Sequence, residues 1–509
     1  MFNKFLRLFI YGTIILGLYI AFHGIWVRYS YWWDELYSVA SASQSWHFMF
    51  NEFILQDVHP PLYLIVLKLW IGIFSNSEPV TRSLSLIFSF GSLIVFYLGL
   101  RKYLSKDVML FIIAFIATNS VFIYWSQETR SNTMMLFMSS IITVFFLRYI
   151  LNNSSKNLYV LLFFVFLGSL THYFALIYGG LILAYIFLTN LFDIKNNLTY
   201  LIAISFTGIL SLIWPIYNLF FSGLNERLGG NFWIQSDGWY STISVISSAL
   251  TRQINITFNV IFNLFNVNLS SSNSVIVALI FIFMIIIIVV IRGNFTDEKS
   301  NNENHLNLFK PMLYVFISFI VVLIAIDYYS PLSIMRSYIV LLPSFYLILA
   351  LSLDEFKRVN ESLVLLFVIG FTLSSIILTI FVYGISINGR SVAQNHASSV
   401  RFIVNNKDFE SSIYITRHQP IHVEMARFYF DFYGSSIEID TIEIENLKSH
   451  DFNSNSFILL QHINVATKEE IILSLSETEI NFEIYVPEMQ RGHPGSSMVI
   501  WIKTPNNDE

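Results

Sequence analysis

The sequence predicts an α-helical polytopic membrane protein with about eleven transmembrane helices and a small C-terminal α/β domain. Of the 509 residues, 55% are hydrophobic and only 12% are charged, about half the charged share of an ordinary soluble domain. Apolar runs of roughly 20 residues, the length that crosses a bilayer in a helix, recur along the chain. Lysine and arginine gather in alternate connecting loops, as the positive-inside rule requires of a membrane protein.

Composition also excludes several classes of site. The net charge of −5 and the lack of a basic stripe give no reason to expect a nucleic-acid partner. The chain has no cysteine, so disulfides, zinc–thiolate sites and thiol nucleophiles are excluded. The first apolar run, residues 8–27, is too long for a typical signal peptide, and no small-residue cleavage site follows it. We therefore expect an anchor helix there.

Eleven apolar runs are long enough to be read as membrane spans. They lie at about 5–28, 82–100, 107–125, 132–150, 158–171, 173–191, 198–221, 274–291, 311–327, 331–352 and 362–386. The two runs that meet near His172 also fit one long hydrophobic block. A further run at 62–74 is too short to cross and predicts an interfacial or re-entrant helix.

The basic residues orient these spans. Under eleven-span counting they fall on one side, which the positive-inside rule assigns to the cytoplasm: Lys4, Arg7, Arg101, Lys102, Lys106, Arg148, Lys156, Lys195, Arg292, Lys299, Lys310, Lys357 and Arg358. This predicts a multi-pass protein of the cell membrane with a cytoplasmic N-terminus. The C-terminal segment then lies outside the cytoplasm.

We expect two domains. Residues 1–387 form the transmembrane domain, with outer loops at 29–81 and 222–273. Residues 388–509 alternate short β-rich runs with helical patterns, which predicts an extracytoplasmic α/β domain.

The first outer loop carries two adjacent acids, Asp34 and Glu35, just after a span and among aromatic residues. One interpretation is an interfacial aromatic belt with acids facing water. The other is a partly desolvated carboxylate with raised proton affinity, as a general base needs.

A second motif, residues 57–63, contains His59 followed by two prolines. The prolines suit the first turn of a helix. His59 then lies at the start of a helix on the membrane surface, where it is either an ordinary surface histidine or a contact for a lipid phosphate.

A third motif is the tight outer turn with Glu128 and Arg130. A Glu–Arg ion pair or a snorkelling arginine would explain both residues. Arg130 equally suits bidentate binding of a phosphate.

Two weaker features lie on the same side. His172 sits where two apolar runs meet, and Arg336 lies about one turn below the outer end of the tenth span. The outer loop 222–273 is either an ordinary loop or a sugar-contacting one, since it contains aromatic and charged residues: Glu226, Arg227, Trp233, Asp237, Trp239 and Tyr240.

Together these motifs resemble one family of membrane enzymes. The acids at 34–35, the motif at 59–63, the turn at 126–130, the motif at 171–173 and the arginine–tyrosine–proline pattern of the tenth span resemble GT-C glycosyltransferases. The similar members are the protein O-mannosyltransferases and the lipid A aminoarabinose transferase. The resemblance covers the first four spans well and the remainder more loosely.

The resemblance implies transfer of one sugar, a hexose or a pentose, from a polyprenyl-phosphate donor to a lipid, glycan or protein acceptor outside the cytoplasm. It implies that Asp34 is the general base, with Glu35 in support and Glu128 as a second acid of the site. Arg130, with His59, Arg336 and His172, is implied to bind the lipid phosphate.

This sequence departs from the family's pattern at two positions of the proposed site. Some relatives have lysine where this chain has His59, and the tyrosine that often follows the arginine motif is replaced around Ser131 and Asn132. The sequence requires no cofactor. A divalent metal ion is compatible with its acids and histidines, but no spacing demands one.

The main alternative is a transporter or flippase of lipid-linked saccharides. Transporters place polar groups near the bilayer midplane and show repeated halves, whereas here the ionisable residues cluster at outer span ends. A membrane scaffold is a third reading, and it leaves the acids at 34 and 128 without a role.

Overall fold

The structure is a computed structural model. It describes residues 4–27, 30–191, 194–221, 239–250, 302–330, 332, 334–357, 360–387, 395–408, 411–416, 420–435, 438–452, 455–461, 465–478, 480–487 and 497–503. The chain divides into two compact units. Unit 1 comprises Met1–His23, Leu55–Tyr63 and Ser83–Tyr383, and unit 2 comprises Gly24–Ile54, Leu64–Arg82 and Gly384–Glu509.

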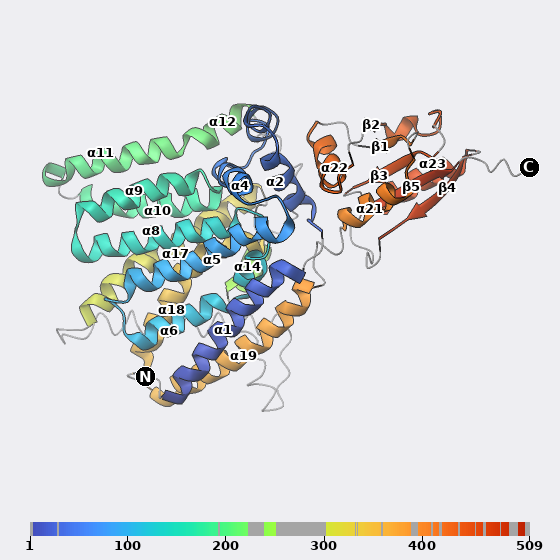
Figure 1. Cartoon of the computed structure of the whole chain (residues 1–509). Coiled ribbons are helices and arrows are strands. Elements are labelled where there is room, and N and C mark those ends of the chain that lie inside the picture. The colour runs from blue at the N-terminus through green and yellow to red at the C-terminus, as the bar shows by residue number, and fades with distance from the viewer. Residues whose placement is uncertain are drawn as a thin grey trace, which may run out of the picture. The chain divides into compact units, whose positions relative to one another are not determined.

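Unit 1 is helical (Figure 1). Its elements are α1 (Lys4–Val27), α5 (Glu78–Leu100), α6 (Lys106–Ala117), α7 (Ser120–Trp125), α8 (Asn132–Asn152), α9 (Ser155–Ser169), α10 (Tyr173–Leu191), α11 (Ile194–Ser211), α12 (Ile213–Phe221), α14 (Trp239–Leu250), α17 (Asn302–Tyr329), the 3₁₀ helix η2 (Met335–Leu341), α18 (Leu342–Lys357) and α19 (Glu361–Ile387). Helices α8, α9 and α10 lie side by side. The first residues of α5 and the last of α1 belong to unit 2.

Within the described residues, eight helical segments are long and apolar enough to cross a membrane. They are Lys4–Val27, Glu78–Leu100, Asn132–Asn152, Tyr173–Leu191, Asn197–Phe221, Asn307–Tyr329, Met335–Lys357 and Glu361–Ile380. The expected run at 158–171 forms the shorter helix α9, and the one at 274–291 lies outside the described residues. The protein is therefore a multi-pass helical membrane protein, and the count of eleven spans stays a prediction.

The run expected as the third span, 107–125, contains a break between α6 and α7. Asn119 caps α7, since its Oδ1 accepts hydrogen bonds from the N–H groups of Val121 and Phe122 at 2.8 and 3.3 Å. Its Nδ2 donates to the carbonyl of Ala249 and to the hydroxyl of Tyr346. Because one buried amide satisfies the interrupted backbone, the apolar run forms two helices instead of one.

Unit 2 contains the first outer loop and the C-terminal sheet. The loop, expected only as a hydrophilic connection, forms α2 (Trp33–Ser43), the one-turn helix α3 (Trp46–Phe48) and the π-helix η1 (Met49–Ile54). Helix α4 (Leu62–Ile73) confirms the expected short apolar helix, and all but its first two residues belong to this unit.

The C-terminal part is an α/β domain, as expected. It contains α21 (His396–Asn406), β1 (Ile413–Ile415), α22 (Pro420–Phe432), β2 (Ile439–Thr441), the 3₁₀ turn η3 (Ile444–Asn446), β3 (Phe457–Leu460), α23 (Val465–Ser476), β4 (Asn481–Tyr485) and β5 (Met498–Lys503). The sheet order is β2-β1-β3-β5-β4. Strands β2, β1 and β3 are parallel, whereas β5 and β4 pair antiparallel.

Both faces of this sheet are covered by helices. Ile471 and Leu475 of α23 pack into a buried cluster with Ile458 of β3 and Ile500 of β5. Side chains alternate between the faces of a strand, so the neighbouring position Trp501 lies on the opposite face, where its ring contacts Phe402 of α21. Burial on both faces explains why β1, β3 and β5, the three central strands, are almost entirely apolar.

Candidate functional site

Asp34 and Glu35 both lie in the first turn of α2, where carboxylates interact favourably with the helix dipole. Their surroundings differ. Asp34 is partly exposed, whereas Glu35 is fully buried and forms a bidentate ion pair with Arg82, with both N–O distances 2.9 Å. Glu35 also accepts a hydrogen bond from the N–H of Trp32 at 3.3 Å. Its two oxygens therefore fix the start of α2, while Asp34 retains access to solvent.

His59 is paired with Asp57. The Nδ1 atom of His59 lies 2.9 Å from a carboxylate oxygen of Asp57, which is buried while the His59 side chain remains 42% exposed. Burial opposes ionisation of Asp57, but the charge and hydrogen bond of His59, together with Arg130, hold its pKa at about 2. Asp57 is thus a fixed negative charge that orients the imidazole.

The segment 57–62 is held in place by residues distant in sequence. The carbonyl of Val58 accepts hydrogen bonds from the hydroxyl of Tyr173 at 2.6 Å and from Nδ2 of Asn218 at 2.8 Å. The N–H of Leu62, at the start of α4, donates to the carbonyl of Leu170. The motif at 171–173 and the motif at 57–63 therefore form one structural element in unit 1.

His172 lies in the turn between α9 and α10 beside this segment. Burial is the largest cause that lowers its pKa, and together with the positive charges of His59, Arg336 and Arg130 it brings the pKa to about 3. Its Nδ1 is 3.2 Å from the N–H of Phe174, which a neutral ring accepts. The Nε2–H of that neutral tautomer is then a hydrogen-bond donor without a charge.

The turn with Glu128 and Arg130 is buried at its centre. Glu128 is fully buried, and the N–H of Arg130 donates to its carbonyl at 2.8 Å. Gln127 donates from Nε2 to the carbonyl of Ile20 in α1, which anchors the turn. Arg336, in η2, stacks over the ring of Trp125 with its guanidinium carbon 5.7 Å from the ring centre.

Unit 1 thus brings together the four residues that the resemblance predicts to bind phosphate: His59, His172, Arg130 and Arg336. The electrostatic couplings of His172 to the other three and of Asp57 to Arg130 place them in one neighbourhood. Asp34 and Glu35 belong to unit 2. Within the described part of the chain, no group of three or more His, Asp or Glu side chains is placed to hold a metal ion.

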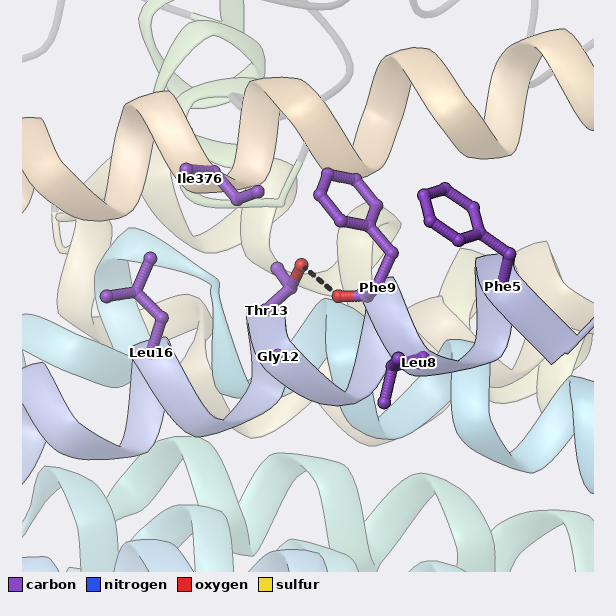
Figure 2. A pocket seen from close by; sticks show the side chains of 7 residues that line it. All are labelled: Phe5, Leu8, Phe9, Gly12, Thr13, Leu16 and Ile376. Carbon is purple, nitrogen blue, oxygen red and sulfur yellow. Dashed lines mark hydrogen bonds between the residues drawn. The ribbon is translucent and has the colours of Figure 1, made fainter.

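An apolar groove of about 290 Å³ lies between α1 and α19 (Figure 2). Its lining is almost entirely hydrocarbon, because Thr13 is buried and its hydroxyl donates to the carbonyl of Phe9 at 3.0 Å. A sugar or phosphate would find no hydrogen-bond partner there. The polar clusters are therefore the candidates for chemistry.

Three residues at these clusters were not singled out from the sequence: Asp57, Arg82 and Asn218. The motif around His59 contains Asp57, and a carboxylate two residues before a histidine is a detectable signal. Arg82 and Asn218 look like an ordinary helix-end cation and a helical amide, and only the fold shows their partners. Most of the outer loop 222–273, including Glu226, Arg227, Trp233 and Asp237, lies outside the described residues.

The comparisons with known proteins point to one fold. Residues 58–214 match the family model of dolichyl-phosphate-mannose-protein mannosyltransferase. The crystal structure of ArnT from Cupriavidus metallidurans bound to undecaprenyl phosphate superposes with a TM-score of 0.60, at 11% identity, over 96% of this chain and 97% of that chain. The chain has the fold of a GT-C membrane glycosyltransferase.

Two further solved structures are similar to this chain, and the first of them is consistent with the GT-C fold. ArnT in the apo state gives a TM-score of 0.50 at 13% identity, again over 96% of this chain and 97% of that one. An oligosaccharyltransferase from Archaeoglobus fulgidus is 11% identical, over 97% of this chain and 74% of its own, with a TM-score of 0.47, too low for an argument. No curated protein matches the sequence significantly.

The family match includes the residues of unit 1 that surround the candidate phosphate site, from His59 to His172, and excludes Asp34 and Arg336. The structural match with the GT-C fold extends over nearly the whole chain. The expected fold class is thereby confirmed. The roles of individual residues remain predictions.

Proposed function

We propose that this protein transfers one sugar from a polyprenyl-phosphate-linked donor to an acceptor on the non-cytoplasmic side of the membrane. The observation that carries this proposal is the cluster of His59, His172, Arg130 and Arg336 next to a helix too short to cross the bilayer. Arginines and an imidazole held by an acid suit a lipid phosphate. The fold of ArnT, which was crystallised with undecaprenyl phosphate, supports the same ligand class.

The proposed reaction is a displacement at the anomeric carbon. Asp34 accepts the proton of an acceptor hydroxyl while the hydroxyl oxygen forms a bond to that carbon. The bond from the anomeric carbon to the phosphate oxygen breaks, and its electron pair leaves with the lipid phosphate. Cationic groups stabilise that leaving group more effectively than a proton donor, because a phosphate is already a good leaving group.

Each residue then has a distinct part. Arg130 and Arg336 supply fixed positive charge, and His59 is oriented by Asp57. His172 donates a neutral hydrogen bond from Nε2. Glu35 supports Asp34 indirectly through its ion pair with Arg82, and Glu128 is the second acid.

The test uses purified full-length protein, radiolabelled polyprenyl-phosphate hexoses and pentoses, and a cell-envelope extract as acceptor. Asp34→Asn is expected to lower transfer by about 10²–10⁴-fold, the usual contribution of a general base, without loss of donor binding. Arg130→Ala is expected to raise the KM for the donor. Asp440→Asn, at an exposed position of β2, is the matched control and should retain full activity.

Retention of full transfer by both Asp34→Asn and Arg130→Ala would exclude this mechanism. A transporter or flippase predicts a different result. It would move labelled donor across vesicle membranes without forming any new glycosidic bond.

A further inference from the structure

Tyr429, on α22 of the C-terminal domain, is buried against the first outer loop within unit 2. Its hydroxyl accepts a hydrogen bond from the N–H of Tyr31 at 2.8 Å and donates to a carboxylate oxygen of Glu78 at 3.1 Å. The hydroxyl of Ser30 lies 3.3 Å away. One buried hydroxyl therefore connects the loop, the start of α5 and the C-terminal domain.

The backbone ahead of Asp34 is held at three successive residues. The carbonyl of Ser30 accepts from Arg82 at 3.1 Å, the N–H of Tyr31 donates to Tyr429, and the N–H of Trp32 donates to Glu35. Helix α2 starts at the next residue, and Asp34 is its second. Asp34 therefore extends from a backbone whose position depends on these three contacts.

The contact between Tyr31 and the accepting hydroxyl of Tyr429 differs from the other two because its residues are 398 positions apart in the sequence. Its neighbours add further contacts. The N–H of Ala397 donates to the hydroxyl of Ser30 at 3.2 Å, and the ring of Trp33 lies against His422 with centroids 5.7 Å apart.

The other end of α2 is held by the same helix of the C-terminal domain. Nε2 of Gln44, the C-cap residue directly after α2, donates to Glu424 at 2.9 Å. Glu424 is fixed in turn by Arg427 at 2.6 Å. Helix α22 thus contacts α2 at both ends.

We propose that Tyr429 is a positioning residue for Asp34, and that the C-terminal domain is thereby a working part of the transferase. The inference rests on the proposed function, since it takes Asp34 as the base. It adds a residue and a domain that act on Asp34 only through the backbone of residues 30–32.

The protonation of Tyr429 agrees with this role. Burial raises the pKa of its hydroxyl well above the usual value, and the nearby Glu78 raises it further. The hydroxyl therefore keeps its proton across the neutral range. It can donate to Glu78 and accept from Tyr31 at the same time.

The experiment compares Tyr429→Phe with Tyr485→Phe in the full-length protein. Tyr429→Phe keeps the ring and removes the hydroxyl, and we expect kcat for sugar transfer to fall about 10- to 100-fold, as displacement of a catalytic group by an ångström does. The affinity for undecaprenyl phosphate should not change, because the candidate phosphate site belongs to unit 1. Tyr485, stacked on Phe402 elsewhere in the same domain, should tolerate the change.

A second readout does not depend on activity. Hydrogen–deuterium exchange of the backbone at residues 30–36 should become faster in Tyr429→Phe and stay unchanged in Tyr485→Phe.

A second variant, Gln44→Ala, releases the other end of α2. It should also lower kcat, but by a smaller factor than Tyr429→Phe. If Tyr429→Phe no longer binds undecaprenyl phosphate, that loss indicates that the variant has not folded. Gln44→Ala then tests the inference in its place.

The outcomes separate the two proposals. Unchanged kcat and unchanged exchange in Tyr429→Phe, with transfer abolished in Asp34→Asn, overturn the positioning role and leave the proposed function intact. Full activity of Asp34→Asn instead removes Asp34 as the base and overturns this inference with it, whereas a lack of any sugar transfer by the unmodified protein overturns the proposed function itself. Equal losses in Tyr429→Phe and Tyr485→Phe would show a general stability effect and also overturn the inference.

Discussion

Asp34 and Glu35 are neighbours in sequence with opposite environments. Glu35 is completely buried against Arg82, whose guanidinium also lies 5.3 Å from the ring centre of Tyr31. A buried ion pair gains little over an apolar pair, but removing one partner leaves an uncompensated charge. The two acids should therefore respond to mutation in different ways.

Glu35→Ala is expected to destabilise the protein by about 3–5 kcal/mol, because Arg82 would remain buried without a partner. Thermal unfolding in detergent measures the loss, and a double-mutant cycle with Arg82→Ala should show strong coupling. The control is Glu477→Ala, which breaks an exposed pair with Lys448 whose side chains are 51% and 55% exposed. An exposed pair contributes at most about 1 kcal/mol, so comparable effects in both variants would refute the assignment.

His172 predicts a dependence of stability on pH. Its folded-state pKa of about 3 lies below the ordinary value of 6.5, so the unfolded chain binds a proton that the folded protein does not. Its contribution is complete above pH 6.5 and is lost as the pH falls from 6.5 toward 3. At pH 5.5 the loss is about 1 kcal/mol.

His172→Gln should reduce the fall in Tm between pH 7 and pH 5.5, and His47→Gln, at an exposed histidine, should leave it unchanged. Thermal unfolding at the two pH values gives the comparison. A steeper fall in His172→Gln than in the unmodified protein would contradict the expected sign.

The sequence singled out the polar side chains of the candidate phosphate site, but not the residues that hold them in place. His59, Arg130, His172 and Arg336 each stand out because ionisable groups are costly at the ends of membrane spans. Tyr429 and Asn218 carry no such signal, since a tyrosine and an asparagine in amphipathic helices are common. Their roles depend on partners more than 100 residues away, which hydropathy does not encode.

At the scale of elements, hydropathy predicted the long helices and the short helix α4 well. It failed at the break between α6 and α7, because the apolar run continues through it and only the hydrogen bonds of Asn119 reveal the interruption. The run expected as a tenth helical span starts as the 3₁₀ helix η2. Hydropathy measures the cost of leaving water and is insensitive to which helical form the backbone takes.

The packing of α1 against α6 depends on one glycine. A Cβ added at Gly17 would overlap the carbonyl oxygen of Ala117 near the end of α6. That oxygen is a backbone atom, so relief requires movement of a helix. Gly12, also on α1, has open space around the same position.

Gly17→Ala should therefore destabilise the protein by about 1–3 kcal/mol, the usual cost of overpacking. Gly12→Ala should be neutral or slightly stabilising, because alanine has the higher helix propensity. Thermal unfolding of the two variants under identical detergent conditions tests this pair. Equal Tm values would show that α1 is not closely packed at Gly17.

For the whole molecule, the predicted orientation can be tested directly because the chain has no cysteine. Single-cysteine variants at Glu469 in α23 and at Lys102 after α5 use exposed positions. A membrane-impermeant maleimide should label position 469 in intact cells, or in spheroplasts where an outer membrane intervenes. Position 102 should react only after the inner membrane is permeabilised.

Labelling of position 102 before permeabilisation would contradict the predicted topology and place this loop outside the cytoplasm. It would also place the proposed transfer on the cytoplasmic side. A cysteine at Glu361, expected near the same side as position 102, provides a second check on the orientation of the last span.

The fold class followed from composition and loop charge, because both reflect the bilayer, a constraint that acts on the whole chain. The C-terminal domain followed from alternating strand and helix patterns. The association of the first loop with the C-terminal domain in one unit did not follow from either. It arises from specific contacts such as those of Tyr31 with Tyr429, which have no local signature.

Helix α4 has a consequence for how a substrate would arrive. Its 12 residues extend about 18 Å, well short of the roughly 30 Å hydrocarbon layer. The predicted interfacial position of α4 would put His59, three residues before its first residue, at the depth of the lipid headgroups. Under the proposed function, a polyprenyl phosphate would then reach the candidate site by diffusing laterally within its own leaflet, with its phosphate hydrated throughout. The search would be two-dimensional, and the encounter rate would depend on the carrier's density per membrane area instead of its bulk concentration.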